Sequence, residues 1–143
     1  MYIDDFLVMT DVAGQAITDA SAASTDYVDS LAESKALVAP GARLKVSVNT
    51  AFSAATGAPT LTVGLQSDTD SGFASNLVTH VTTTAALAAA LTAGTVLLDI
   101  QLPVNVQRYI RLYFTLGGTG TFDAGKVDGM IVLDTNRTMD RSL

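Results

Sequence analysis

The fold of this chain is decided by residues 42–66, which read ARLKVSVNTAFSAATGAPTLTVGLQ. Residues 42–50 and 60–66 each alternate apolar and polar side chains, and the small residues of 54–59 separate them. Successive side chains of a strand point to opposite faces, so this alternation predicts two half-buried antiparallel strands joined by a turn at 54–59. The two strands are expected to share one buried face, made of Leu44, Val46, Val48, Leu61, Val63 and Leu65.

The same alternation recurs along the rest of the chain, and the glycine-rich run 117–120 (GGTG) indicates another turn. The alanines and leucines of Thr84–Leu91 favour a short helix, with Thr84 as its N-cap and Gly94 as its end. Seven or eight strands with one short helix are typical of an all-β sandwich or barrel. Further strands are predicted at 77–83, 96–102, 108–116 and 126–134, with Leu98, Ile100, Ile110, Leu112, Phe114, Ile131 and Leu133 buried.

The composition predicts a single domain spanning residues 1–143. Residues 1–10 are interpreted as an N-terminal arm or first strand, and residues 135–143, which lack a core pattern, as a C-terminal tail. The chain has no cysteine, which excludes disulfides and zinc–thiolate sites. Residues 73–98 carry no charge, but polar side chains dilute them too much for a membrane helix. Since the start of the chain is acidic where a secretory signal is basic, we expect a soluble protein without a membrane partner.

Acidic residues are concentrated at the start of the chain. The first 34 residues hold seven of the 14 acidic residues and no lysine or arginine, and the whole chain has a net charge of −6. This argues against a nucleic-acid partner, because such affinity comes mainly from cations on phosphates. Two interpretations stay open: the acidic region is attracted to a basic protein surface, or its aspartates keep a chain that is 48% apolar in solution.

Few residues offer catalytic chemistry. His80 is the one histidine and no Gly-x-Ser-x-Gly motif is present, so we interpret His80 as a surface or hydrogen-bonded histidine in a strand. Asp68, Asp70 and Gly72 resemble the start of a calcium loop, but its later glycine and glutamate are missing. An Asx-type turn is the favoured interpretation, and ion binding by the two aspartates stays open. We expect no enzymatic activity, no metal and no cofactor.

Tyr109, Arg111 and Tyr113 form a row that points away from the predicted core. Tyrosine and arginine anchor protein interfaces, because each combines a large apolar body with a polar end. A strand covered by a loop or a second sheet explains the row equally well. If these three side chains do form an interface, we expect them to lie near a contact between subunits of an oligomer. Charged residues near the two ends are further candidates for contacts with a partner: Asp4, Asp5, Arg137 and Arg141.

The chain contains, in order, YID (2–4), LKVSVNTAF (44–52), TLTVGLQS (60–67), RYIRLYFTLGGT (108–119), GKV (125–127) and VLD (132–134). Together these stretches resemble the small capsid cement proteins of tailed phages, of the type first associated with a Bordetella phage. The resemblance implies a jelly-roll-like antiparallel β-sandwich with extended termini. It also implies a virion protein on the outer capsid surface that cements neighbouring major capsid subunits and has no catalytic residues.

The expected partners are therefore the major capsid protein and further copies of the chain itself, as a dimer or trimer. The alternative hypothesis is a ligand- or carbohydrate-binding β-sandwich, such as a receptor-binding or lectin-like module. The absence of tryptophan and an aromatic content of 6% count against a platform for stacking sugars.

Overall fold

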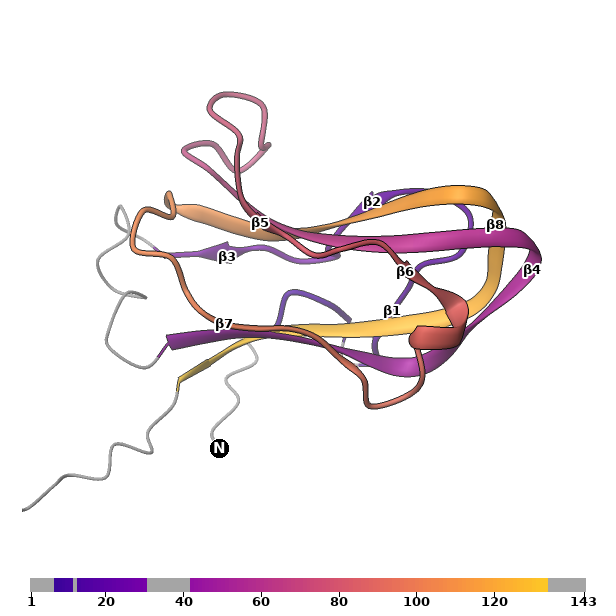
Figure 1. The fold of residues 1–143 in the computed structure, drawn as a ribbon. Coiled ribbons are helices and arrows are strands. Elements are labelled where there is room, and N and C mark those ends of the chain that lie inside the picture. Colours follow the sequence, from indigo (N-terminus) through magenta and orange to yellow (C-terminus); the bar gives the residue numbers. More distant parts are fainter. Residues whose placement is uncertain (1–6, 12, 31–41, 134–143) are drawn as a thin grey trace, which may run out of the picture.

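The computed structural model describes residues 7–11, 13–30 and 42–133, which form an eight-stranded antiparallel sheet bent into two packed layers (Figure 1). The predicted all-β sandwich is confirmed. Within these ranges, no helix is long and apolar enough to cross a membrane. The elements are β1 (Gln15–Ala16), β2 (Ala22–Ala23), β3 (Val28–Asp29), β4 (Ala42–Asp68), β5 (Val78–Thr82), β6 (Ala86–Leu87), the 3-10 helix η2 (Ala88–Ala90), β7 (Val96–Gln101) and β8 (Tyr109–Leu133).

Two long strands dominate the sheet. β4 has 27 residues and β8 has 25, and each joins two segments that the sequence pattern predicts as separate strands. They pair along their whole length, from Ala42 opposite Leu133 to Asp68 opposite Tyr109. The result is a single two-stranded ribbon to which all the shorter strands attach.

The predicted turns at 54–59 and 117–120 are wrong. Both segments remain in extended antiparallel pairing with each other, so neither is a hairpin turn that pairs the strand segments on its two sides. The register of the ribbon shifts repeatedly between Val48 and Thr56, which marks β-bulges, and bulges bend a sheet and increase its twist. The ribbon therefore folds over here, and we call the two segments the crease.

The crease divides the ribbon between two layers that face each other (Figure 1). In one layer, the first half of β4 and the second half of β8 lie between β7 and β1. In the other, the second half of β4 and the first half of β8 lie between β5 and β6 on one side and β2 and β3 on the other. Each layer is apolar on one face, and packing these faces together removes both from water.

The core lies between the layers. Val46, from the first half of β4, and Val63, from the second half, are 0% and 1% exposed. The predicted face is therefore buried, but as two opposed layers rather than one continuous face. Ile100 is only partly buried against the core, and the Leu133 side chain lies outside the described part. The predicted core residues that are buried are Leu44, Val46, Val48, Leu61, Val63, Leu65, Leu98, Ile110, Leu112, Phe114 and Ile131.

Residues 7–10 are the described part of the predicted arm or first strand, and they pack onto the sandwich. Met9 is fully buried, and its N–H donates to the carbonyl of Gly129 at 2.9 Å. This segment makes a single bridge to β8, so it resembles the first-strand alternative more than a free arm. The remaining arm residues, 1–6, and the predicted tail, 135–143, lie outside the described residues.

The helix predicted at Thr84–Leu91 is wrong. Ala86 and Leu87 instead form β6 against β4, and η2 is a single 3-10 turn. A run of eight residues is too short to sustain a helix by propensity alone. Pairing of Ala86 and Leu87 with β4 provides partners for backbone N–H and C=O groups of this segment, and this pairing decides its conformation.

β7 contains a bulge that changes the predicted orientation of Val96. Val46 pairs with Leu98 but Ser47 pairs with Val96, which leaves Leu97 as an extra residue. One inserted residue reverses the alternation of faces. Val96 is consequently 50% exposed, although unbroken alternation with Leu98 and Ile100 in the predicted strand 96–102 would place it on the buried face.

Gly120 and Gly94 provide a matched test of packing at the crease. Their φ angles are +86° and +85°, so alanine is strained at both positions. A Cβ at Gly120 would overlap the carbonyl oxygen of Thr56 on the paired strand, whereas one at Gly94 would meet nothing within 4 Å. We expect Gly120→Ala to lower the free energy of unfolding by about 1–3 kcal/mol more than Gly94→Ala, measured by urea denaturation. Equal losses would contradict tight packing at the crease.

Candidate interaction surface

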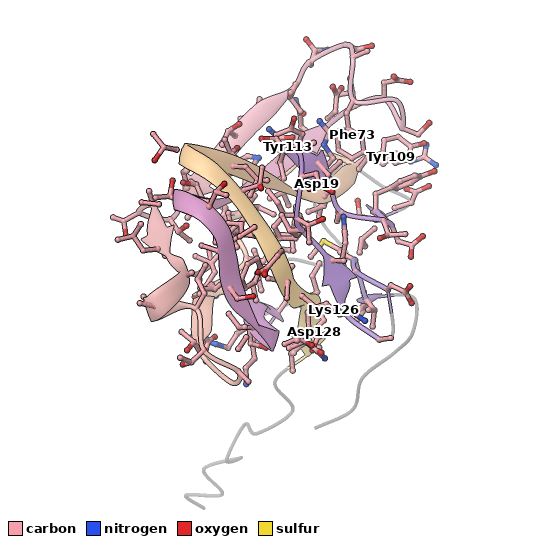
Figure 2. All side chains as sticks on the ribbon, turned by 90° about the vertical axis from the view of Figure 1, so that its right-hand side faces the viewer. Asp19, Phe73, Tyr109, Tyr113, Lys126 and Asp128 are labelled. Carbon is pink, nitrogen blue, oxygen red and sulfur yellow. The ribbon has the colours of Figure 1, made fainter. Side chains whose placement is uncertain are left out.

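The first half of β8 presents a row of three large side chains to solvent. Tyr109, Arg111 and Tyr113 are each partly exposed on the outer face of the layer, and the apolar residues between them are fully buried. The predicted orientation of the row is thus confirmed, and its role as an interface stays a prediction. Figure 2 shows Tyr109 and Tyr113 near Phe73, apart from Lys126 and Asp128 on the second half of β8.

The Arg111 guanidinium is held in place by three neighbouring side chains. Its central carbon lies 4.3 Å from the centre of the Phe73 ring and 5.5 Å from that of Tyr113. Its Nε donates to Oε1 of Gln66, on the paired strand, at 2.9 Å. Burial lowers the pKa of Arg111 from its ordinary value, with Tyr113 and Asp68 acting in the opposite direction. The side chain remains a cation at neutral pH and is fixed in orientation.

Two aromatic residues that sequence reasoning missed extend this row. Tyr27, from the segment between β2 and β3, packs edge-on against Tyr109 at 5.6 Å between ring centres and against Phe73 at 6.0 Å. Phe73 is 8% exposed and comes from the loop between β4 and β5, so both lie far from β8 in the sequence. We call Tyr27, Phe73, Tyr109, Arg111 and Tyr113 the aromatic–arginine surface.

Arg108 lies at the edge of this surface but is neutralised within the chain. Its Nε and Nη2 donate to the two carboxylate oxygens of Asp29 at 2.8 and 3.0 Å. Hydrogen bonding to Asp29 raises the pKa of Arg108 above its ordinary value. The guanidinium also lies 4.9 Å from the centre of the Tyr109 ring. Arg108 therefore ties β3 to β8 and adds little net charge to the surface.

The loop that carries Phe73 is fastened to the end of β4 by Asp68. This fully buried carboxylate accepts hydrogen bonds from the N–H groups of Asp70 at 3.0 Å, Asn76 at 3.0 Å and Ser75 at 3.2 Å. Burial by itself raises the pKa of Asp68, but these donors outweigh it, so the net pKa is below the ordinary 3.8. The predicted Asx-type turn is confirmed. Phe73 has a φ of +54°, rare for a bulky residue, so the loop holds it in a strained conformation.

His80 joins β5 to the end of β4. Its Nε2 lies 2.6 Å from Oγ of Ser67, and Ser67 Oγ also accepts the N–H of Gln107 at 3.0 Å. Burial lowers the pKa of His80, and a hydrogen bond with the Asn105 side chain opposes this. These contacts confirm the interpretation of a hydrogen-bonded histidine. Ser67 has no exposed surface, so this pair connects β4, β5 and the β7–β8 loop.

The remaining predicted contact residues cannot be placed on this surface. Asp4, Asp5, Arg137 and Arg141 lie outside the described residues. In the described ranges, no three histidine or acidic side chains are grouped as metal ligands would be. The contacts described on this surface are packing, hydrogen bonds and charge interactions.

The fold and this surface define a β-sandwich that carries a cluster of aromatic and arginine side chains on the outer face of one layer. A family model described as Bbp16 matches residues 12–131, well over half of the chain. The chain belongs to the Bbp16 family, which is phage-associated. The match includes every residue of the aromatic–arginine surface. No curated protein matches the chain.

Asp68→Asn tests how the loop is held. An amide offers one acceptor oxygen in place of two, so we expect a lower urea midpoint at pH 7. Because the folded pKa of Asp68 lies below 3.8, its stabilisation is present above about pH 4 and is lost as the pH falls through the folded value. The difference in urea midpoint between the wild type and Asp68→Asn should therefore become smaller at low pH.

Asp70→Asn is the matched control, since the exposed Asp70 carboxylate accepts only the Gly72 N–H within the described residues. It should lower the midpoint less at pH 7. A constant difference between the wild type and Asp68→Asn from pH 7 to pH 3 would contradict this account.

Proposed function

We propose that this chain is a structural virion protein that binds the outer surface of a phage capsid and cements neighbouring major capsid subunits. The family match over residues 12–131 carries the proposal. The resemblance of the strand sequences to tailed-phage cement proteins supports it, and so does the all-β sandwich. Such a protein acts by burying surface on several neighbours at once, so that separating the neighbours costs more free energy.

The structure suits a mechanical role. In support, the two longest strands run through both layers, so a continuous strand pair joins the two layers. We further propose that the protein is not an enzyme. In support, Ser67, the serine beside the single histidine, is completely buried and out of reach of a substrate.

The proposed partners are the major capsid protein and other copies of this chain, as a dimer or trimer, without nucleic acid or membrane. A net charge of −6 supports a location away from the packaged genome, because like charges repel. The aromatic–arginine surface is proposed as one of the contacts with a neighbouring subunit.

The alternative of a carbohydrate-binding module gains little from the structure. Sugars stack on open aromatic faces, but Arg108 lies over the ring of Tyr109 and Arg111 lies near that of Tyr113. Tyr27 packs edge-on against both Phe73 and Tyr109. The rings mainly support one another and the guanidinium groups.

Particles assembled without this protein test the proposal. Purified protein added to them should co-sediment and raise the temperature at which they lose integrity. Arg111→Ala should weaken binding by about 1–2 kcal/mol, because truncating an interface arginine removes both packing and charge. The isolated variant should keep its fold by circular dichroism.

Arg43→Ala is the matched control. Arg43 is an exposed arginine of β4 whose Nε pairs with Asp99 at 2.9 Å, and it lies on the other layer. Its loss should leave particle binding unchanged. Failure of the wild-type protein to bind particles, together with binding on a glycan array, would replace the proposal with the carbohydrate-binding alternative.

A further inference from the structure

Arg111 is the one arginine of the described residues that lacks a carboxylate partner. Arg43 pairs with Asp99, and Arg108 makes two hydrogen bonds to Asp29. Among the described residues, the acceptor that the Arg111 guanidinium meets is the neutral side chain of Gln66, through Nε. Within the described residues, the two Nη groups of Arg111 therefore have no hydrogen-bond acceptor.

Asp68 is near enough to act on Arg111 but does not neutralise it by direct contact. Its two carboxylate oxygens receive the N–H groups of the β4–β5 loop, and no ion pair joins it to Arg111. The charge of Arg111 is thus partly desolvated and uncompensated by direct contact in the described part of the chain. Desolvating a charge without a partner costs free energy, and a carboxylate from outside would offset that cost.

The side chains that surround Arg111 also fix the direction in which its Nη groups point. The Phe73 ring lies 4.3 Å from the guanidinium carbon, and Gln66 holds Nε. A planar guanidinium matches a carboxylate through two parallel hydrogen bonds. Because the side chain is already held in one orientation, little conformational entropy is lost when such a partner binds.

We propose that Arg111 is a binding site for an acidic side chain of a different protein in the particle, with Tyr109 and Tyr113 packing against the apolar residues beside that side chain. This inference rests on the proposed function. The site lies on an open face rather than in a cavity. A partner held there by one ion pair needs additional contact area around that pair for stable binding, and a protein supplies such an area. A different protein is the occupant proposed here because the proposed function places the chain against the major capsid protein, and a second copy of this chain is the competing outcome of the test below.

Zero-length crosslinking identifies the partner group. Arg111→Lys keeps the charge and places a primary amine in the site, and a carbodiimide joins an amine to a carboxylate within contact distance. After the variant is bound to particles, crosslinked and digested, mass spectrometry should find position 111 joined to an aspartate or glutamate of another particle protein. Arg43→Lys is the matched control, because its amine should crosslink to Asp99 of the same chain.

A second variant tests whether binding to particles depends on the positive charge of Arg111. Arg111→Gln should lower particle affinity at least about tenfold and reduce the dependence of association on salt, since it removes the cation. An unchanged affinity would overturn the inference.

The crosslinking outcomes separate this inference from the proposed function. If position 111 forms no crosslink while particle occupancy is full and the Arg43→Lys control reacts, the inference is wrong and the cementing role stands. A crosslink to an aspartate of a second copy overturns the occupant proposed here and makes the site a self-contact. If the wild-type protein does not bind particles, the proposed function itself is wrong.

Discussion

The pairing of β4 with β8 is the constraint on which the rest of the structure depends. The ribbon runs through both layers, so its register places one half of the core opposite the other. Because the period of a strand is two, burying Ile110, Leu112 and Phe114 obliges Tyr109, Arg111 and Tyr113 to point outward at regular spacing. The spacing of the candidate interaction surface is therefore fixed by the same pattern that builds the core.

The strand pattern could be predicted from the sequence because apolar and polar side chains alternate along a half-buried strand, and this alternation depends only on neighbouring residues. The crease could not. Residues 54–59 and 117–120 are rich in the small residues that also form hairpin turns, and only their pairing with each other shows that the chain continues through them. The same limit applies to Thr84–Leu91, where propensity favours a helix but pairing with β4 gives a strand and one 3-10 turn.

The candidate surface, like the fold, could be predicted from the sequence only in part. Its row on β8 follows from alternation, but Tyr27 and Phe73 arrive from other segments, and no local signal relates them to Arg111. The Asx turn at Asp68 was visible in the sequence, yet its effect on the position of Phe73 depends on hydrogen bonds to residues up to Asn76. Long-range pairing thus decides which side chains meet, and the sequence alone leaves that open.

An electron cryo-microscopy reconstruction of the assembled particle tests the central claim most directly. The account predicts the β-sandwich on the outer capsid surface, with the layer that carries Arg111 in contact with a neighbouring subunit. A particle whose outer surface lacks the sandwich would contradict the cementing role. A bound sandwich whose aromatic–arginine surface faces solvent would contradict the interface derived from the fold.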